Sequence, residues 1–217
     1  MNTILFNGTK ILCVARNYKP HAEELGNAVP KEPLWFTKPP SSIIAHNGTI
    51  ILPEGFGRID YEGELAVVIS RKAKNVSQPE AYDYIDGVTA AIDVTARELQ
   101  KLDGQWTRAK GFDTFCPLGP KILPFSKSWL ESEISTILNG KTVQNDHLTS
   151  LIFPIDVLIS HISKVMTLER GDIILTGTPA GVGPLNHGDN IEVVIDGPER
   201  LSIKCSAKSQ STVQNTL

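Results

Sequence analysis

Two glutamates, Glu62 and Glu64, share one face of an apolar segment that runs from Tyr61 to Ile69. Residues two apart on a strand point to the same side, and both sides of this segment become apolar after the glutamates, as in a strand buried on both faces. Two carboxylates at the start of a buried strand need a compensating cation. A divalent metal ion would compensate both. The alternative is one solvated glutamate and one that pairs with an arginine.

A third carboxylate, Asp93, ends the apolar segment 88–92 just before an expected helix. Taken alone, an aspartate there is better explained as a helix cap or a turn residue. Together with Glu62 and Glu64 it would form an all-oxygen cluster, with no His or Cys at ligand spacing beside it. Such a cluster favours Mg²⁺, with Mn²⁺ or Ca²⁺ as alternatives, and three protein ligands leave positions open for water or substrate.

A candidate general base lies nearer the N-terminus, where His21 and Glu24 are three residues apart. On a short helix the two side chains would share a face, and a carboxylate beside an imidazole orients the ring and raises its basicity. An ordinary surface pair is the alternative. Because residues 19–31 are rich in Pro, Gly and charge, we expect them to form a mobile lid that orders over a ligand.

Two lysines and a glycine-rich segment complete the candidate groups. Lys38 and Lys110 lie in apolar stretches, so each would either neutralise a substrate carboxylate or enolate, or extend its ammonium group to solvent. Residues 171–184 are typical of a strand that enters a Gly-rich loop, whose backbone N–H groups would bind a carboxylate. The loop matches neither a P-loop nor the GxGxxG pattern, so nucleotide binding is not expected.

The elements that must position these groups are short β-branched segments bounded by turn residues. They lie too close together, with too few helices between them, for a doubly wound α/β sheet. We therefore predict a β-rich α+β fold of several packed sheets with a few short helices. The expected strands cover residues 10–15, 34–37, 49–52, 62–70, 88–94, 135–138, 172–176, 190–195 and 201–205.

The helices are expected over 20–26, 78–85, 95–102 and 154–163. Thr95 and Glu98 have the spacing of a capping box at the start of the third helix. Asn139-Gly140 is a typical two-residue hairpin turn. The polar residues 206–217 are expected to fray after the last strand.

Composition excludes several classes of protein. The 217 residues suit one domain, and 21 Lys and Arg against 24 Asp and Glu give a net charge of −3, which argues against nucleic-acid binding through bulk charge. Apolar runs are too short to span a membrane, and no signal peptide is recognisable at the N-terminus. Cys13, Cys116 and Cys205 lie far apart, which suits a reducing cytoplasm.

These motifs occur together in the fumarylacetoacetate hydrolase (FAH) family, which the chain resembles over nearly its whole length. The likeness is strongest to the small single-domain members of the acylpyruvate hydrolase type. The motifs that carry it are Arg16-Asn17-Tyr18 with His21 and Glu24, Phe36-Thr37-Lys38-Pro39, Tyr61-Glu62-Gly63-Glu64-Leu65, Asp93-Val94-Thr95-Ala96-Arg97, Lys110-Gly111-Phe112-Asp113, and the segment from Leu175 to Pro184.

The resemblance implies a role for each of these positions. Glu62, Glu64 and Asp93 fall on the metal ligands of the family, and Lys110 falls on its active-site lysine. His21 and Glu24 fall on a dyad that activates water. The positions that line the substrate site are Arg16, Gln100 and Thr178. The family fold is a mixed β roll or sandwich, usually assembled as a homodimer, so the resemblance predicts one catalytic domain over residues 1–217.

The function implied is a Mg²⁺-dependent hydrolase that cleaves a C–C bond of acylpyruvate-type 2,4-diketo acids to give pyruvate and a carboxylic acid. The partner expected is thus a small 2-keto acid, with no nucleic acid or membrane involved. The same enolate-stabilising site would also suit an oxaloacetate keto–enol tautomerase or decarboxylase, or an isomerase of 2-hydroxyhepta-2,4-diene-1,7-dioate. Enolate stabilisation is common to all these reactions, and the His21–Glu24 pair favours hydrolysis.

Overall fold

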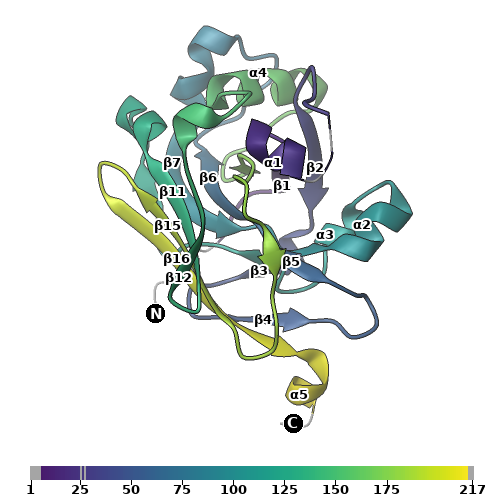
Figure 1. Cartoon of the computed structure of the whole chain (residues 1–217). Helices are drawn as coiled ribbons and strands as arrows, with labels where there is room; N and C mark the ends of the chain where they lie inside the picture. Colours follow the sequence, from purple (N-terminus) through teal and green to yellow (C-terminus); the bar gives the residue numbers. More distant parts are fainter. Residues whose placement is uncertain (1–5, 25, 27, 215–217) are drawn as a thin grey trace.

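The computed structural model describes residues 6–24, 26 and 28–214, in which the strands form four sheets (Figure 1). The largest is a mixed sheet, because β1 and β13 are parallel while the other neighbours are antiparallel. Its six strands, in spatial order, are β10 (Leu123–Pro124), β7 (Ile85–Ile92), β6 (Gly63–Ile69), β13 (Ile173–Leu175), β1 (Ile11–Ala15) and β2 (Leu34–Lys38).

The second sheet has five strands, and β16 joins β4 in parallel at one edge. The expected turn at Asn139-Gly140 links β11 to β12, and both residues have positive φ (51° and 81°), as a two-residue hairpin turn of this kind requires. In spatial order the strands are β12 (Lys141–His147), β11 (Glu133–Leu138), β15 (Asn190–Asp196), β16 (Arg200–Ser209) and β4 (Thr49–Leu52).

Two small sheets and several short helices complete the described structure. The small sheets are β14 (Gly183–Pro184), β5 (Ile59–Tyr61) and β8 (Thr95–Ala96), and β3 (Ile43–Ile44) with β9 (Cys116–Pro117). The α-helices are α1 (Lys19–Glu24), α2 (Arg97–Asp103), α3 (Thr107–Lys110), α4 (Ile155–Val165) and α5 (Gln210–Gln214). The 3₁₀ helices are η1 (Pro40–Ser42), η2 (Gln78–Tyr84), η3 (Lys127–Glu131) and η4 (Leu148–Ser150).

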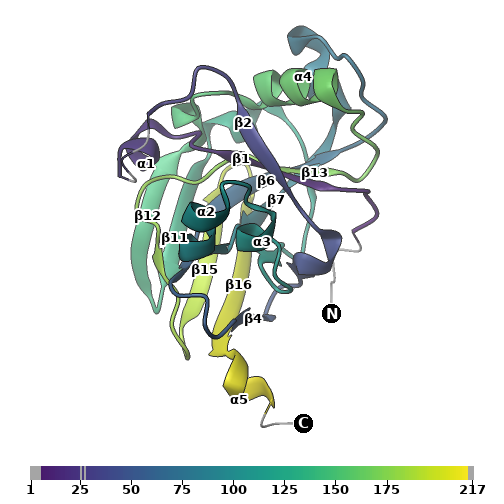
Figure 2. The ribbon, with the colours of Figure 1, turned by 90° about the vertical axis from the view of Figure 1, so that its right-hand side faces the viewer.

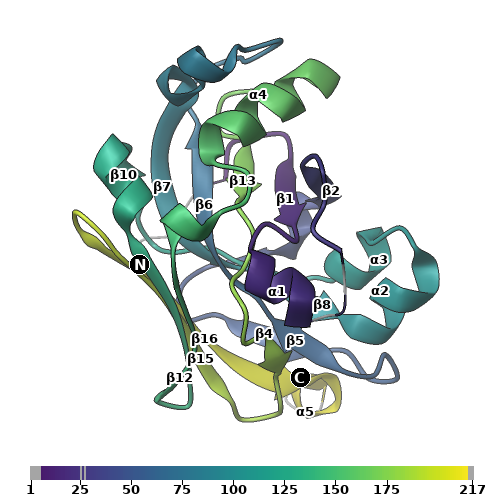
Figure 3. The ribbon, with the colours of Figure 1, turned by 45° about the horizontal axis from the view of Figure 1, so that its top comes forward.

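The helices lie around the outside of the packed sheets. Helix α4 lies across one end of the molecule, while α2 and α3 lie side by side in front of the sheets in Figure 2. In Figures 1 and 3, α1 lies between the five-stranded sheet and the α2–α3 pair. The β-rich α+β fold predicted from the sequence is confirmed.

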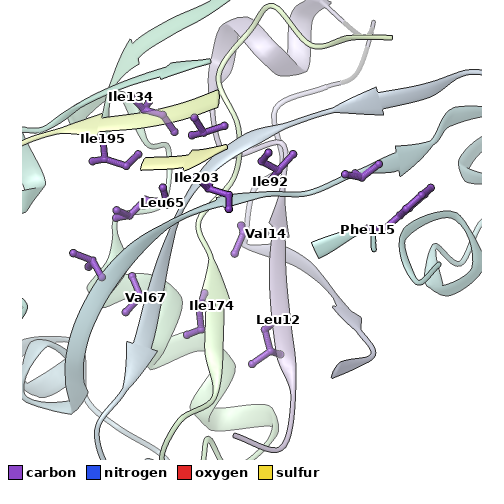
Figure 4. Packing of buried hydrophobic residues seen from close by; sticks show 14 of the residues in the cluster. Leu12, Val14, Leu65, Val67, Ile92, Phe115, Ile134, Ile174, Ile195 and Ile203 are labelled. Atoms are coloured by element: carbon purple, nitrogen blue, oxygen red, sulfur yellow. The ribbon is translucent and has the colours of Figure 1, made fainter. Parts of the chain in front are cut away.

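The main core lies between the two large sheets (Figure 4). Leu65 and Ile92 on the six-stranded sheet belong to the same buried cluster as Ile134 and Ile203 on the five-stranded sheet. The opposite face of the six-stranded sheet is also covered, by a second cluster that includes Ala66. All seven residues of β6 are buried, so the strand is covered on both faces as its sequence predicts.

Three local predictions need correction. The capping box is wrong, because Thr95 lies in β8 and donates its hydroxyl to the Asp93 carbonyl, while Glu98 accepts the Arg58 N–H. The third helix begins at residue 97 and not at 95, and the helix expected over 78–85 is of the 3₁₀ type. Strand β12 was not predicted, since its sequence KTVQNDH lacks the apolar alternation of a strand.

The C-terminal segment is ordered beyond the point where fraying was expected. Strand β16 runs to Ser209, and its residues 206–209 pair with β4. Residues 215–217 lie outside the described structure, as do residues 25 and 27 of the predicted lid, and the lid stays a prediction. None of the helices in the described ranges is long and apolar enough to cross a membrane.

Candidate active site

Three carboxylates come together where β6 begins and β7 ends. Glu62 immediately precedes β6, Glu64 lies within it, and Asp93 follows β7, which pairs with β6 in antiparallel register. The Asp93 N–H donates to the Glu62 carbonyl at 2.8 Å, which closes this end of the ladder. Ligand oxygens of the three side chains lie within 4.8 Å of one another, and all three residues are buried. The predicted carboxylate cluster is therefore present.

Two buried lysines compensate part of this charge. The Nζ of Lys110, at the end of α3, lies 2.8 Å from Glu62 Oε2 and 2.6 Å from Asp93 Oδ2. The Nζ of Lys38, at the end of β2, lies 2.5 Å from Asp93 Oδ1 and also donates to the Val94 carbonyl. Neither ammonium group extends to solvent, because both residues are buried.

Arg97 extends the network away from the cluster. Its Nη2 lies 2.7 Å from Glu62 Oε1, and its Nε donates to Asp60 Oδ2 at 2.8 Å. Arg58 forms a second ion pair with Asp60. Glu62 therefore pairs with an arginine, which the sequence gives as an alternative to metal binding. It also belongs to the carboxylate cluster, so the two arrangements occur together.

The surroundings shift the pKa values of the two glutamates in opposite directions. Burial alone would raise the pKa of Glu62, but Lys110 and Arg97 outweigh it and hold that pKa well below its usual range. Burial raises the pKa of Glu64 well above its usual value, and the Asp93 and Glu62 carboxylates raise it further. Glu64 accepts the Gly177 N–H at 2.6 Å, but no basic side chain of the described residues forms an ion pair with it.

This donor set fits a divalent metal ion. The three residues offer only carboxylate oxygens, the ligands that Mg²⁺, Mn²⁺ and Ca²⁺ prefer. One of the three, Glu64, is buried with no ion-pair partner in the part of the chain that the structure describes, and a metal ion bound beside it would supply the missing positive charge. The cluster therefore suits a hard divalent cation of this group, as the sequence predicts.

His21 and Glu24 lie together on α1, as their spacing predicts. His21 Nδ1 is 3.7 Å from Glu24 Oε2, which is too long for a hydrogen bond. Within the described structure His21 Nδ1 has no hydrogen-bond partner, although the residue is only 4% exposed. Burial lowers the pKa of His21, the Glu62 charge opposes this, and Arg97 reinforces it. The imidazole is therefore neutral near pH 7 and able to accept a proton.

The glycine-rich loop binds carboxylates, but they belong to the protein. The Gly177 N–H donates to Glu64, and the Gly181 N–H donates to both oxygens of Glu24 at 3.1 and 3.2 Å. Tyr61 in turn donates its hydroxyl to the Gly181 carbonyl. The loop thus connects the carboxylate cluster to α1. The sequence predicts that its N–H groups bind a substrate carboxylate, but these two N–H groups bind glutamates of the protein.

A cavity of about 250 Å³ opens onto these groups. Six predicted residues line it: Arg16, His21, Glu62, Gln100, Lys110 and Thr178. Asp93, Glu64 and Lys38 are buried behind this lining. Arg16 has φ of 56°, a conformation that is uncommon for a residue with a side chain and that occurs often at functional sites.

Sequence reasoning missed part of the lining. Phe36 and Trp106 form an edge-to-face pair with ring centroids 5.4 Å apart, and Lys110 Nζ lies 4.9 Å from the Phe36 ring centroid. Arg97 lines the cavity as well. Like Phe36, it belongs to a family motif but was not predicted to take part in the site. Trp106 lies between α2 and α3, and nothing in the local sequence marks it as facing the cavity, because its position depends on how those two helices pack.

Comparisons with known proteins agree with this arrangement. A family model described as fumarylacetoacetate (FAA) hydrolase C-terminal matches residues 10–209. A mitochondrial oxaloacetate tautomerase of Arabidopsis thaliana is 49% identical over 197 residues, which cover 88% of this chain and 87% of that protein. A mitochondrial oxaloacetate decarboxylase of Dictyostelium discoideum is 41% identical over 203 residues, which cover 91% of this chain and 93% of that protein.

A solved structure extends the likeness to three dimensions. The 2-hydroxyhepta-2,4-diene-1,7-dioate isomerase from Mycobacterium marinum superposes with a TM-score of 0.84 and is 41% identical. The match covers 93% of this chain and 75% of that chain. Fold and sequence are therefore shared over most of the length with proteins whose names describe reactions at 2-keto or 2-hydroxy diacids.

Proposed function

Because this chain belongs to the fumarylacetoacetate hydrolase family, we propose that it is a metal-dependent enzyme that interconverts the enol and keto forms of oxaloacetate or a similar small 2-keto diacid. One observation carries the proposal: a buried imidazole, that of His21, and a buried ammonium group, that of Lys110, line the same small cavity. A volume of about 250 Å³ lies below the range typical of pockets for drug-sized ligands, which suits a small diacid. The names of the Arabidopsis and Dictyostelium relatives support the choice of oxaloacetate.

The carboxylate cluster is the proposed metal site. Glu62, Glu64 and Asp93 would hold a divalent cation, Mg²⁺ in this proposal, and the bound cation would supply positive charge that stabilises an enolate oxygen. Lys110 contributes a second positive charge, since Asp93 and Glu62 outweigh its burial and raise its pKa, which keeps the ammonium group protonated. With a cation held by the three carboxylates, both charges would be in place before substrate arrives, which is the condition for effective electrostatic stabilisation.

His21 carries the proton in this mechanism. In the keto-to-enol direction the C3–H bond breaks and its proton passes to the imidazole. The electron pair of that bond forms the C2=C3 double bond, and the C2 carbonyl oxygen becomes an enolate. The imidazolium then returns the proton to this oxygen, so His21 ends neutral. A positioned general base of this kind accelerates proton transfer by about 10²–10⁴-fold.

The substrate carboxylates are assigned to the cationic and polar lining of the cavity. Arg16 and Thr178 lie in that lining, together with Gln100, which also accepts a hydrogen bond from Arg97. The aromatic pair Phe36 and Trp106 supplies an apolar part of the same lining. A diacid held in this way keeps its reacting carbons near the imidazole, and water is excluded on the aromatic side.

Hydrolysis of an acylpyruvate is the second candidate, and the dyad favours it. A carboxylate 3.7 Å from the imidazole, as Glu24 is from His21, suits removal of a proton from water. The resulting hydroxide would attack the distal carbonyl, and the C–C bond would break to give a carboxylic acid and the enolate of pyruvate. The isomerase reaction and tautomerisation both need proton transfer, and neither needs an attacking water.

One assay with two substrates tests the proposal. Metal-stripped protein receives enol-oxaloacetate or acetylpyruvate, with and without Mg²⁺, and loss of the enol absorbance is followed. We expect Mg²⁺-dependent conversion of enol-oxaloacetate to the ketone without formation of pyruvate. An oxaloacetate rate equal to the buffer rate would contradict the tautomerase proposal. Cleavage of acetylpyruvate to pyruvate and acetate would establish the hydrolase instead.

The cellular setting and assembly remain part of the proposal. Three buried free cysteines support a reducing cytoplasm, although the names of the plant and worm relatives place those proteins in mitochondria. The homodimer and the single domain over residues 1–217 stay predictions of the family resemblance.

A further inference from the structure

Strand β12 is an exposed edge strand with one buried residue, and that residue is polar. Gln144 is only 2% exposed, while its neighbours Val143 and Asn145 are partly or fully exposed. Burying a primary amide is unfavourable unless its donors and acceptor are satisfied. The amide of Gln144 must therefore find hydrogen-bond partners inside the protein.

The contacts fix the orientation of the amide without ambiguity. The Gly63 N–H can only donate, so the atom that faces it at 3.0 Å is the carbonyl oxygen of Gln144. The Pro179 carbonyl can only accept, so the atom that faces it at 2.8 Å is the amide nitrogen. The second N–H of that nitrogen donates to Thr178 Oγ1 at 2.8 Å. A flipped amide would lose the hydrogen bonds to the Gly63 N–H and to the Pro179 carbonyl, and the Thr178 hydroxyl would have to donate to it instead of accepting.

This orientation decides what Thr178 offers to the cavity. Its hydroxyl already accepts a hydrogen bond from Gln144, so its own proton remains to be donated elsewhere. Thr178 lines the cavity, and the described structure gives its hydroxyl no acceptor. The side chain therefore presents an O–H donor to whatever occupies the cavity, and the partner it selects is an acceptor such as a carboxylate oxygen.

The same amide also anchors the carboxylate cluster. Gly63, whose N–H it binds, is the residue between Glu62 and Glu64. A Cβ at Gly63 would lie 2.1 Å from Thr136 Oγ1 on the neighbouring sheet, so the two sheets approach closely here. On the loop side, a Cβ at Gly181 would lie 2.1 Å from the Val143 carbonyl, so the loop packs directly on β12.

We propose that Gln144 is a positioning residue for the reaction: it sets Thr178 as a hydrogen-bond donor to a substrate carboxylate and fixes the loop of Thr178 to the strand of Glu62 and Glu64. The inference rests on the proposed function for the identity of the substrate. Gln144 does not line the cavity, so it acts through Thr178 and not by contact with substrate.

A double-mutant cycle on ligand binding tests the inference. The probe is oxalate, a small dicarboxylate, measured by calorimetry with Mg²⁺ present. Gln144→Met keeps the volume and adds no charge, and it should weaken oxalate binding by about fivefold, the worth of one net hydrogen bond. In a Thr178→Val background the same change should alter binding by less than about twofold, since the hydroxyl through which it acts is gone. Equal effects in both backgrounds, or no effect in either, would overturn the inference.

Further variants separate positioning from folding. Gln78→Met makes the same substitution at an exposed glutamine on η2 and should leave oxalate binding unchanged. Gln144→Glu places a carboxylate oxygen where the amide nitrogen donates, so it should reduce oxalate affinity more than Gln144→Met does. Thr178→Ser keeps the hydroxyl and should retain near wild-type affinity. Loss of affinity in Thr178→Ser equal to that in Thr178→Val would contradict the donor role.

The outcomes also separate this inference from the proposed function. Oxalate binding with the expected coupling, but without turnover of oxaloacetate, would remove the tautomerase proposal and keep the role of Gln144. Turnover of oxaloacetate, with effects of Gln144→Met and Thr178→Val on oxalate binding that simply add, would keep the tautomerase proposal and remove the role of Gln144. Absence of oxalate binding by the wild-type protein would contradict both. The kinetic counterpart is a raised KM for oxaloacetate in Gln144→Met with little change in kcat.

Discussion

The carboxylate cluster and helix α1 meet at one cavity, but they are held in place in different ways. Glu62 and Asp93 lie at the ends of two paired strands, and each of their carboxylates contacts two cations. The carboxylate of Glu24 on α1 is held by one backbone N–H, that of Gly181, and its side chain is 36% exposed. His21 beside it has no hydrogen-bond partner at Nδ1 among the residues with described positions.

The difference assigns a separate task to each region. Charges that stabilise an enolate must not move during the reaction, and a double-sided buried strand with a closed ion network provides that rigidity. A proton carrier needs access to the substrate and a neutral ring, and a short helix tied to a loop provides both. Substitutions in the cluster should therefore abolish activity, and substitutions on α1 should slow proton transfer while ligand binding persists.

The largest effect is expected from Asp93→Asn. The change removes a proposed metal ligand and the partner of both buried lysines, so activity should fall by about 10³-fold or more. Loss of a buried ion-pair partner should also lower the free energy of unfolding by about 3–5 kcal/mol. Steady-state rates across a Mg²⁺ titration and thermal unfolding measure the two effects. Asp196→Asn, on the exposed end of β15, is the matched control; a wild-type Mg²⁺ response in Asp93→Asn would remove Asp93 from the site.

Lys110→Met should come next. The variant keeps the length of the side chain but loses the charge that faces Glu62 and Asp93, so kcat should fall by about 10²–10³-fold. The KM for oxaloacetate should change less, because the charge is needed most as the enolate forms. Lys204→Met on the exposed side of β16 controls for a change of net charge. A Lys110→Met enzyme with raised KM and unchanged kcat would make this lysine a binding group only.

A smaller effect follows from acidification. Burial lowers the pKa of His21, so the ring gains its proton only below the usual value of about 6.5. The neutral form is the active base, and kcat/KM should therefore be level above that pH and fall about tenfold per unit once the pH is below the lowered pKa. A pH profile of kcat/KM measures this. An acid limb centred above 6.5 would contradict the environment assigned to His21.

The smallest effect is expected from Glu24→Gln. The amide oxygen still accepts the Gly181 N–H, and only the charge that orients the imidazole is lost. We expect kcat to fall by about tenfold or less, with KM unchanged. Glu23→Gln, on the same helix and exposed, is the matched control because, among the residues that the structure describes, Glu23 forms an ion pair only with Lys19, at 3.8 Å. A loss as large as that of Asp93→Asn would mean that Glu24 belongs with the carboxylate cluster.

Much of the cluster could be predicted from sequence, because its geometry is local to two strands. The alternation in β6 places Glu62 and Glu64 on one face, and the apolar run of β7 ends at Asp93. Period-2 patterns of this kind survive folding, since a buried strand leaves little freedom in its register. The short helix that brings His21 and Glu24 together is also predictable from local sequence, because residues three apart on a helix share a face.

The remaining site residues depend on tertiary packing. Gln144 lies in a polar edge strand that carries no apolar alternation, and its role appears only once the loop of Thr178 packs on it. Trp106 faces the cavity because α2 and α3 pack together. Thr95 and Glu98 have the spacing of a capping box, but the Thr95 hydroxyl donates to the nearby Asp93 carbonyl, and Glu98 accepts a long-range hydrogen bond from the Arg58 N–H.

The most direct test uses one variant, His21→Ala, to separate ligand binding at the carboxylate cluster from proton transfer by α1. His21→Ala, with Mg²⁺ present, is assayed for oxalate binding by calorimetry and for conversion of enol-oxaloacetate to the ketone by absorbance. The division of tasks predicts oxalate affinity within about twofold of the wild-type value and a fall in kcat of about 10²–10⁴-fold. Wild-type turnover in His21→Ala would contradict the assignment of proton transfer to α1.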